Sequence, residues 1–100
     1  MNIDLVKLQE ECAEVIHIVS KIHRFGIDEV HPVTKLSNDE LLHKEVGDVL
    51  AIIERLKQQG ILKEEILKIW KEFKLLKFEG STNPDNTKPE DNGGLARFTL

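Results

Sequence analysis

The feature that most constrains this fold is the spacing of apolar residues, which recur every three or four positions along three segments of the chain. This spacing matches the helical period of about 3.6 residues, and no segment shows the every-second-residue alternation of a half-buried strand. The first segment is expected to form a helix from Ile3 to Phe25, with Gly26 as its stop. Its apolar positions are Leu5, Leu8, Cys12, Val15, Ile16, Val19 and Ile22.

Start and stop signals delimit two further helices. The stretch SNDE places Ser37 at an N-cap position and Glu40 three residues later, which is the pattern of a capping box. The helix that begins there is expected to end near Gln59, because a glycine follows. A third helix is expected from about Leu62 to Phe78, with Gly80 as its stop.

The segments outside these helices differ in composition. The connector IDEVHPVTKL contains a proline and several β-branched residues, so we expect no helix there. The very short turn before the third helix predicts that the second and third helices pack antiparallel. Together the patterns predict an all-α domain of three principal antiparallel helices over residues 1–79, in a bundle completed by oligomerisation, and an irregular C-terminal tail over residues 80–100.

Size and charge limit the classes of function. A chain of 100 residues, 40% of them apolar, forms at most one domain with a modest core, which favours a homodimer or homotetramer. The net charge of −4 argues against binding to nucleic acid. No apolar run approaches the roughly 20 residues of a membrane span, and MNIDLVKLQEE does not have the pattern of a secretory signal. We therefore expect no membrane partner. Cys12 is the single cysteine, so we expect a cytoplasmic protein without an internal disulfide.

Acidic residues lie where the second helix is expected to bury its apolar side. In LHKEVGDVLAIIERL, Glu45 shares that apolar side and Asp48 borders it. Glu11 and Glu14 repeat the same three-residue spacing at the margin of the apolar stripe on the first helix. If the two helices pack antiparallel, these four carboxylates converge on one point.

Converging carboxylates repel one another, and removing each from water costs several kcal/mol, so such a group needs a cation. An all-oxygen site without thiolates suits Mg²⁺ first and Mn²⁺ second. A helical Mg²⁺ cage with an open side suggests chemistry on phosphate esters or phosphoanhydrides. The alternative at this point is a solvated acidic surface, which is common on highly charged helices.

The acidic motifs resemble those of a known family. The pattern EExxE followed by ExxD occurs here as EECAE, which contains Glu10, Glu11 and Glu14, and as EVGD, which contains Glu45 and Asp48. In that order, on two expected helices, it resembles the signature of MazG-type nucleoside triphosphate pyrophosphohydrolases of the all-α NTP pyrophosphatase superfamily. The resemblance covers roughly residues 3–79. The spacer between the two motifs is slightly longer than is usual in that family.

The resemblance implies a Mg²⁺-dependent hydrolase that cleaves a nucleoside triphosphate between the α and β phosphates, releasing a monophosphate and pyrophosphate. It implies that four acids hold the metal, namely Glu11, Glu14, Glu45 and Asp48. Either Glu11 or Glu14 would activate the attacking water, and Glu10 would orient a ligand or a lysine from behind the site. Basic residues on the third helix resemble phosphate contacts of the family, here Lys71, Lys74 and Lys77.

Two other classes of function compete with this hypothesis. Two Glu-x-x-His units, EVIH with His17 and ELLH with His43, match the unit of di-iron carboxylate bundles. On a regular helix, however, Glu40 and His43 point well away from Glu45 and Asp48. The second competitor is a non-catalytic helical oligomerisation or adaptor module whose acids are surface charge.

Overall fold

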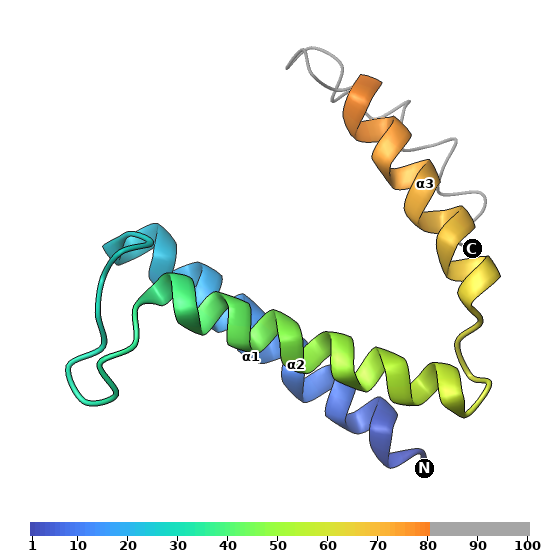
Figure 1. Cartoon of the computed structure of the whole chain (residues 1–100), viewed down its shortest axis with the longest axis horizontal. Helices are drawn as coiled ribbons and strands as arrows, with labels where there is room; N and C mark the ends of the chain where they lie inside the picture. Colours follow the sequence, from blue (N-terminus) through green and yellow to red (C-terminus); the bar gives the residue numbers. More distant parts are fainter. Residues whose placement is uncertain (81–100) are drawn as a thin grey trace. The chain divides into compact units, whose positions relative to one another are not determined.

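The computed structural model describes residues 1–80, which form three α-helices: α1 (Ile3–Phe25), α2 (Asn38–Gln58) and α3 (Glu64–Gly80) (Figure 1). The only β-type pairing in residues 1–80 is an isolated bridge between Val30 and Ser37. The prediction of an all-α fold is therefore confirmed. The predicted tail lies almost wholly outside the described residues. Within residues 1–80, none of the helices has the length and apolar character needed to cross a bilayer.

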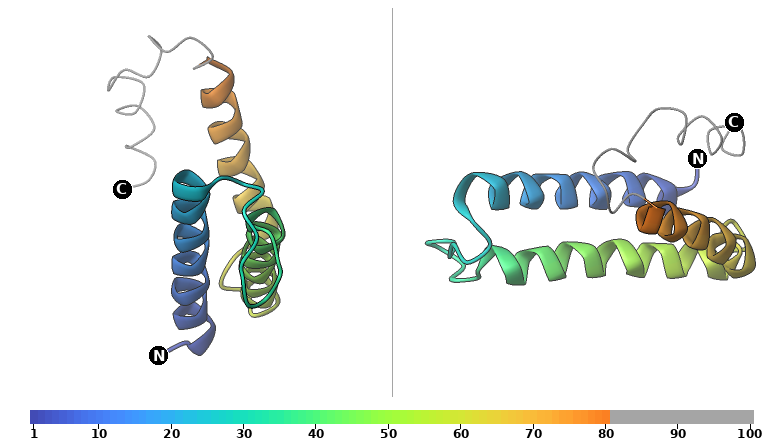
Figure 2. Two further views of the ribbon diagram at one scale, coloured as in Figure 1. Left: turned by 90° about the vertical axis from the view of Figure 1, so that its left-hand side faces the viewer. Right: turned by 90° about the horizontal axis from the view of Figure 1, so that it is seen from above.

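The first 62 residues form one compact unit, in which α1 and α2 pack side by side as an antiparallel hairpin (Figure 2). Helix α3 belongs to a second unit that begins at Lys63. The predicted antiparallel packing of α3 against α2 stays a prediction, as does completion of the bundle by oligomerisation.

Local hydrogen bonds explain where α1 and α2 begin. The Asn2 carboxamide oxygen accepts hydrogen bonds from the amides of Asp4 (2.8 Å) and Leu5 (3.1 Å), which caps α1. The predicted capping box of α2 is confirmed: the Glu40 amide donates to Ser37 Oγ, and the Ser37 amide donates to Glu40 Oε1, both at 3.1 Å. Gly26 follows α1 with a φ of 94°, a conformation that favours glycine.

The connector between α1 and α2 folds back on itself. The His31 amide donates to the Leu36 carbonyl (2.8 Å), and the Lys35 amide donates to the His31 carbonyl (2.9 Å). At the start of α2, the buried Asn38 side chain donates to the Gly26 carbonyl (2.8 Å). The connector therefore contains no helix, as predicted, and it is tied by hydrogen bonds to both ends that it joins.

A buried acid joins the start of α1 to the end of α2. The Asp4 side chain is only 4% exposed, and both of its oxygens lie 3.2 Å from Arg55 Nε. The Gln59 side-chain amide also donates to Asp4, and Asn2 donates to Gln59. The hydrogen bond from Arg55 is the largest cause that lowers the pKa of Asp4 below its usual value, and the Gln59 hydrogen bond lowers it further. Asp4 therefore stays ionised at neutral pH and stabilises the hairpin.

Replacing Asp4 should destabilise the protein in a pH-dependent way. A carboxyl with a lowered pKa in the folded state contributes stability above its unfolded pKa of about 3.9, and this stability is lost as the pH falls through the folded value. We expect Asp4→Asn to lower the melting temperature by several degrees at pH 7, with the difference from wild type shrinking below about pH 4. Thermal melts monitored by circular dichroism measure both effects.

The matched control is Asp28→Asn, which removes an exposed carboxylate from the connector. This variant should melt close to wild type at neutral pH. A constant melting-temperature difference between Asp4→Asn and wild type from pH 7 to pH 2 would contradict the assigned role of the Asp4 charge.

Candidate metal centre

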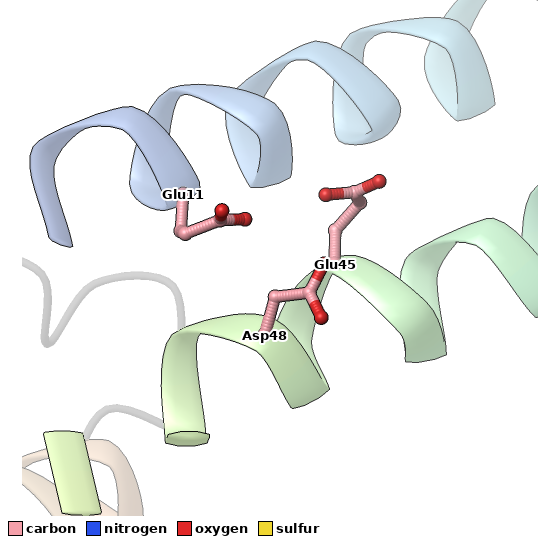
Figure 3. A group of neighbouring side chains, drawn as sticks. All are labelled: Glu11, Glu45 and Asp48. Carbon is pink, nitrogen blue, oxygen red and sulfur yellow. The ribbon is translucent and has the colours of Figure 1, made fainter. Parts of the chain in front are cut away.

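Three carboxylates from the two helices of the hairpin meet in one place. Glu11 of α1 and Glu45 and Asp48 of α2 each offer an oxygen, and these atoms all lie within 4.8 Å of one another. Figure 3 shows Glu11 extending from α1 toward α2 and Glu45 extending from α2 toward α1. Among residues 1–80, this is the only group of three or more acidic, histidine or cysteine side chains with a geometry able to hold a metal ion. We call these three residues the acid cluster.

Helix α1 packs on the edge of α2 that carries the acids. The Glu45 side chain is only 14% exposed, whereas its apolar neighbour Val46 is exposed. At about 100° per residue, Glu45 lies on the same side of α2 as Ile52 and Leu56, and Leu56 is fully buried. The hairpin therefore encloses Glu45 and leaves part of the apolar sector of α2 in solvent. Asp48, at the border, is 42% exposed.

A lysine partly neutralises the acid cluster. Lys44 Nζ lies 3.0 Å from Asp48 Oδ2 and 3.4 Å from Glu45 Oε1. The hydrogen bond to Asp48, followed by the one to Glu45, raises the pKa of Lys44 above its usual value, so the ammonium stays charged. The carboxylates thus already hold a cation, and a metal ion that binds them competes with Lys44.

Glu14, predicted as a fourth ligand, does not join the acid cluster. It is exposed and lies instead along a pocket of about 260 Å³ that the acid cluster adjoins through Glu45. The polar side chains of this pocket come from α1, the connector and α2: Glu14, His17, Lys21, His31, Thr34 and Glu45. Its apolar wall is formed by Ile18 and Leu41.

The remaining predicted site residues are not part of the acid cluster. Glu10 is exposed on α1, next to Glu11 in sequence. The three lysines predicted to bind phosphate lie on α3, in the second unit, and Lys74 Nζ sits 5.3 Å from the centre of the Phe78 ring. Their proposed contact with a phosphate stays a prediction.

The histidine units of the di-iron alternative do not form a ligand group in residues 1–80. The Glu40 carboxylate accepts hydrogen bonds from Ser37 in the capping box, and His43 Nδ1 lies 2.9 Å from the Asp39 carbonyl oxygen and 3.5 Å from Asp39 Oδ1. The Glu40–His43 motif is therefore explained by local helix capping and by surface pairing.

Comparisons with models of known protein families, with curated proteins and with solved structures found no match. The functional argument therefore rests on the acid cluster, the pocket beside it and the sequence motifs that supply them.

Removing Lys44 should strengthen binding of Mg²⁺ to the acid cluster. In Lys44→Met the competing ammonium is lost while the aliphatic part of the side chain is kept, so we expect the Kd for Mg²⁺ to fall roughly two- to fivefold. Isothermal titration calorimetry with MgCl₂ and no nucleotide measures this directly.

Lys57→Met is the matched control, because Lys57 pairs with Glu54 (3.2 Å) on the same helix and away from the acid cluster. It should leave the affinity for Mg²⁺ unchanged. Weaker Mg²⁺ binding by Lys44→Met than by Lys57→Met would show that Lys44 does not compete with the ion.

Proposed function

We propose that this protein is a Mg²⁺-dependent nucleoside triphosphate pyrophosphohydrolase that cleaves its substrate between the α and β phosphates. The observation that carries this proposal is the acid cluster, in which the two motifs of the MazG-type resemblance supply Glu11 from one helix and Glu45 and Asp48 from the next. The proposal extends to a cytoplasmic location, which the sequence suggests.

The donor set of the acid cluster fits a hard divalent ion. All of its ligand atoms are carboxylate oxygens, which suit Mg²⁺ and Mn²⁺ rather than softer metals. The three oxygens already lie within 4.8 Å of one another, so changes of side-chain rotamer would bring them to the roughly 2.1 Å that a Mg²⁺ ligand needs. Asp48 is partly exposed, which leaves the substrate a route of approach. When bound there, Mg²⁺ supplies positive charge that offsets the charge of the phosphate groups.

The other acids of the motif take different roles in this proposal. Glu11 is a ligand in the acid cluster, so Glu14, which lies outside it, is the carboxylate that orients the attacking water and accepts its proton. Glu10 does not bind the metal in this proposal, but orients one of its ligands or a lysine. On α3, Lys71, Lys74 and Lys77 contribute positive charge toward the β and γ phosphates.

A substrate panel tests the proposed reaction. With Mg²⁺, we expect the wild-type protein to release pyrophosphate and a nucleoside monophosphate from at least one canonical or modified (d)NTP. Glu45→Gln keeps the size of the side chain but removes a ligand charge, so it should lower kcat/KM by roughly 100-fold or more. It should also lose most of the thermal stabilisation by Mg²⁺, which is about 2.7 kcal/mol at 100 times the Kd.

Glu54→Gln, on the exposed side of the same helix, is the matched control and should retain activity and the response to Mg²⁺. Orthophosphate as the direct product would exclude α–β cleavage. A non-catalytic oligomerisation module predicts instead that no (d)NTP is hydrolysed and that Mg²⁺ leaves the melting temperature unchanged.

The exposed apolar side chains of the hairpin support self-association. Ile16 of α1 is 70% exposed and Leu50 of α2 is 60% exposed. Within residues 1–80, Ile18 and Leu56 are the only buried hydrophobic residues. Because α1 and α2 are antiparallel, turning the same way around each helix carries both apolar stripes to one face of the hairpin. We therefore propose a homodimer or homotetramer in which a second copy covers this face.

Introducing a charge on this face should dissociate the oligomer. We expect wild-type protein to have at least twice the mass of one chain by light scattering. Stable interfaces bury about 1,200–2,000 Å² and exclude unpaired charge, so a carboxylate introduced on this face should weaken the interface. Leu50→Glu should shift the protein toward the monomer.

Gln58→Glu, which adds the same charge at an exposed polar position of α2, should keep the mass of the wild-type protein. A monomeric wild-type protein at micromolar concentration would contradict the proposed assembly.

A further inference from the structure

The pocket beside the acid cluster has the features of a binding site for an uncharged polar group. Its volume of about 260 Å³ is slightly below the roughly 300 Å³ at which ligand pockets usually begin, so it suits part of a small molecule. Glu45 belongs both to its wall and to the acid cluster. A substrate whose phosphates lie at the acid cluster therefore has its remaining part within reach of this pocket.

The charges of the pocket disfavour a second phosphate. Glu14 contributes a negative charge that Lys21 balances, and the charge of Glu45 is shared with the acid cluster. Without a net positive charge, the pocket does not compensate an anion. A sugar or base, which needs hydrogen bonds and an apolar surface for its ring, suits the combination of these polar groups with Ile18 and Leu41.

His31, a residue of the connector that lines this pocket, has a defined hydrogen-bond donor. His31 Nδ1 accepts hydrogen bonds from the amides of Val33 (3.1 Å) and Thr34 (3.2 Å). An imidazole nitrogen that accepts carries no proton, so in the neutral ring the proton is on Nε2. The turn over residues 31–34 thereby fixes the tautomer of His31.

We propose that the pocket binds the nucleoside part of the substrate and that His31, held as an Nε2–H donor by its own turn, is a specificity-determining residue that donates to a sugar or base oxygen or nitrogen. This inference rests on the proposed function for the location of the phosphates. Thr34, whose hydroxyl accepts from the Leu36 amide (3.3 Å), also lines this pocket.

Two substitutions of His31 separate its role in the turn from its role in binding. His31→Asn places an oxygen near the position of Nδ1, where it still accepts from the two amides, but it lacks the group at the position of Nε2. His31→Gln places an amide donor near the position of Nε2 but lacks the acceptor near the backbone. The first variant therefore tests the donor, and the second tests the turn.

We expect His31→Asn to raise KM for the preferred (d)NTP roughly three- to tenfold, the effect of one lost hydrogen bond, with kcat and melting temperature close to wild type. His31→Gln should lower the melting temperature and change KM less. An unchanged KM in His31→Asn would overturn the proposal.

A binding measurement separates this inference from the proposed reaction. Histidine-ring ¹H–¹⁵N spectra should show His31 as the Nε2–H tautomer, and nucleoside 5′-monophosphates with Mg²⁺ should shift its signals. Inorganic pyrophosphate with Mg²⁺ should leave them in place, and the exposed His43 should respond to neither probe.

The outcomes of the two experiments are distinct. If no (d)NTP is hydrolysed but monophosphates shift the His31 signals, the pocket binds nucleosides and the proposed reaction is wrong. If a (d)NTP is hydrolysed but pyrophosphate shifts His31 as much as the monophosphates do, the reaction stands and the assignment of the pocket to the nucleoside is wrong.

Discussion

The register between α1 and α2 is the constraint on which the acid cluster depends. Asp4 of α1 pairs with Arg55 of α2 at one end of the hairpin. Glu11 lies seven residues after Asp4, Asp48 lies seven residues before Arg55, and these two acids also lie close together. Seven residues are close to two helical turns, so both pairs lie on the same contact edge. At the other end, the Asn38 side chain is bonded to the Gly26 carbonyl. A slip of one turn, about 5.4 Å, would break these end contacts and separate Glu11 from its partners.

The two enclosed acids of the hairpin are compensated to different degrees. Asp4 receives hydrogen bonds from Arg55 and from Gln59, which satisfy both of its oxygens within the chain. Glu45 is nearly as enclosed, yet it pairs with Lys44 at 3.4 Å, and the Lys44 side chain is 57% exposed. An enclosed carboxylate with a weak internal partner and two acidic neighbours gains more from a divalent ion than from the chain itself. This difference supports a structural role for Asp4 and a ligand role for Glu45.

Helical periodicity and capping residues predicted the elements of the fold, because both act over a few neighbouring residues. The bounds of α1 and the capping box of α2 are confirmed. Contacts between the helices were predicted less well, because their rotation about one another is set by distant residues. Periodicity grouped four acids, whereas the packing collects three and leaves Glu14 in the adjoining pocket. The Asp4 network was missed, since an aspartate in the first turn is explained equally well by the helix dipole.

The same rotation that assembles the acid cluster also explains the exposed apolar face. Packing α1 further toward Val46 and Leu50 would bury more of the α2 stripe, but it would turn Glu45 away from α1. The observed contact instead encloses Glu45 and leaves Leu50 exposed. Each Å² of apolar surface left exposed forgoes about 25 cal/mol of stabilising free energy. The described part of the hairpin has few buried hydrophobic residues, so this loss of apolar burial is offset when another surface covers the exposed face. The acid cluster and the exposed apolar face, on which we propose self-association, are therefore two consequences of one packing arrangement.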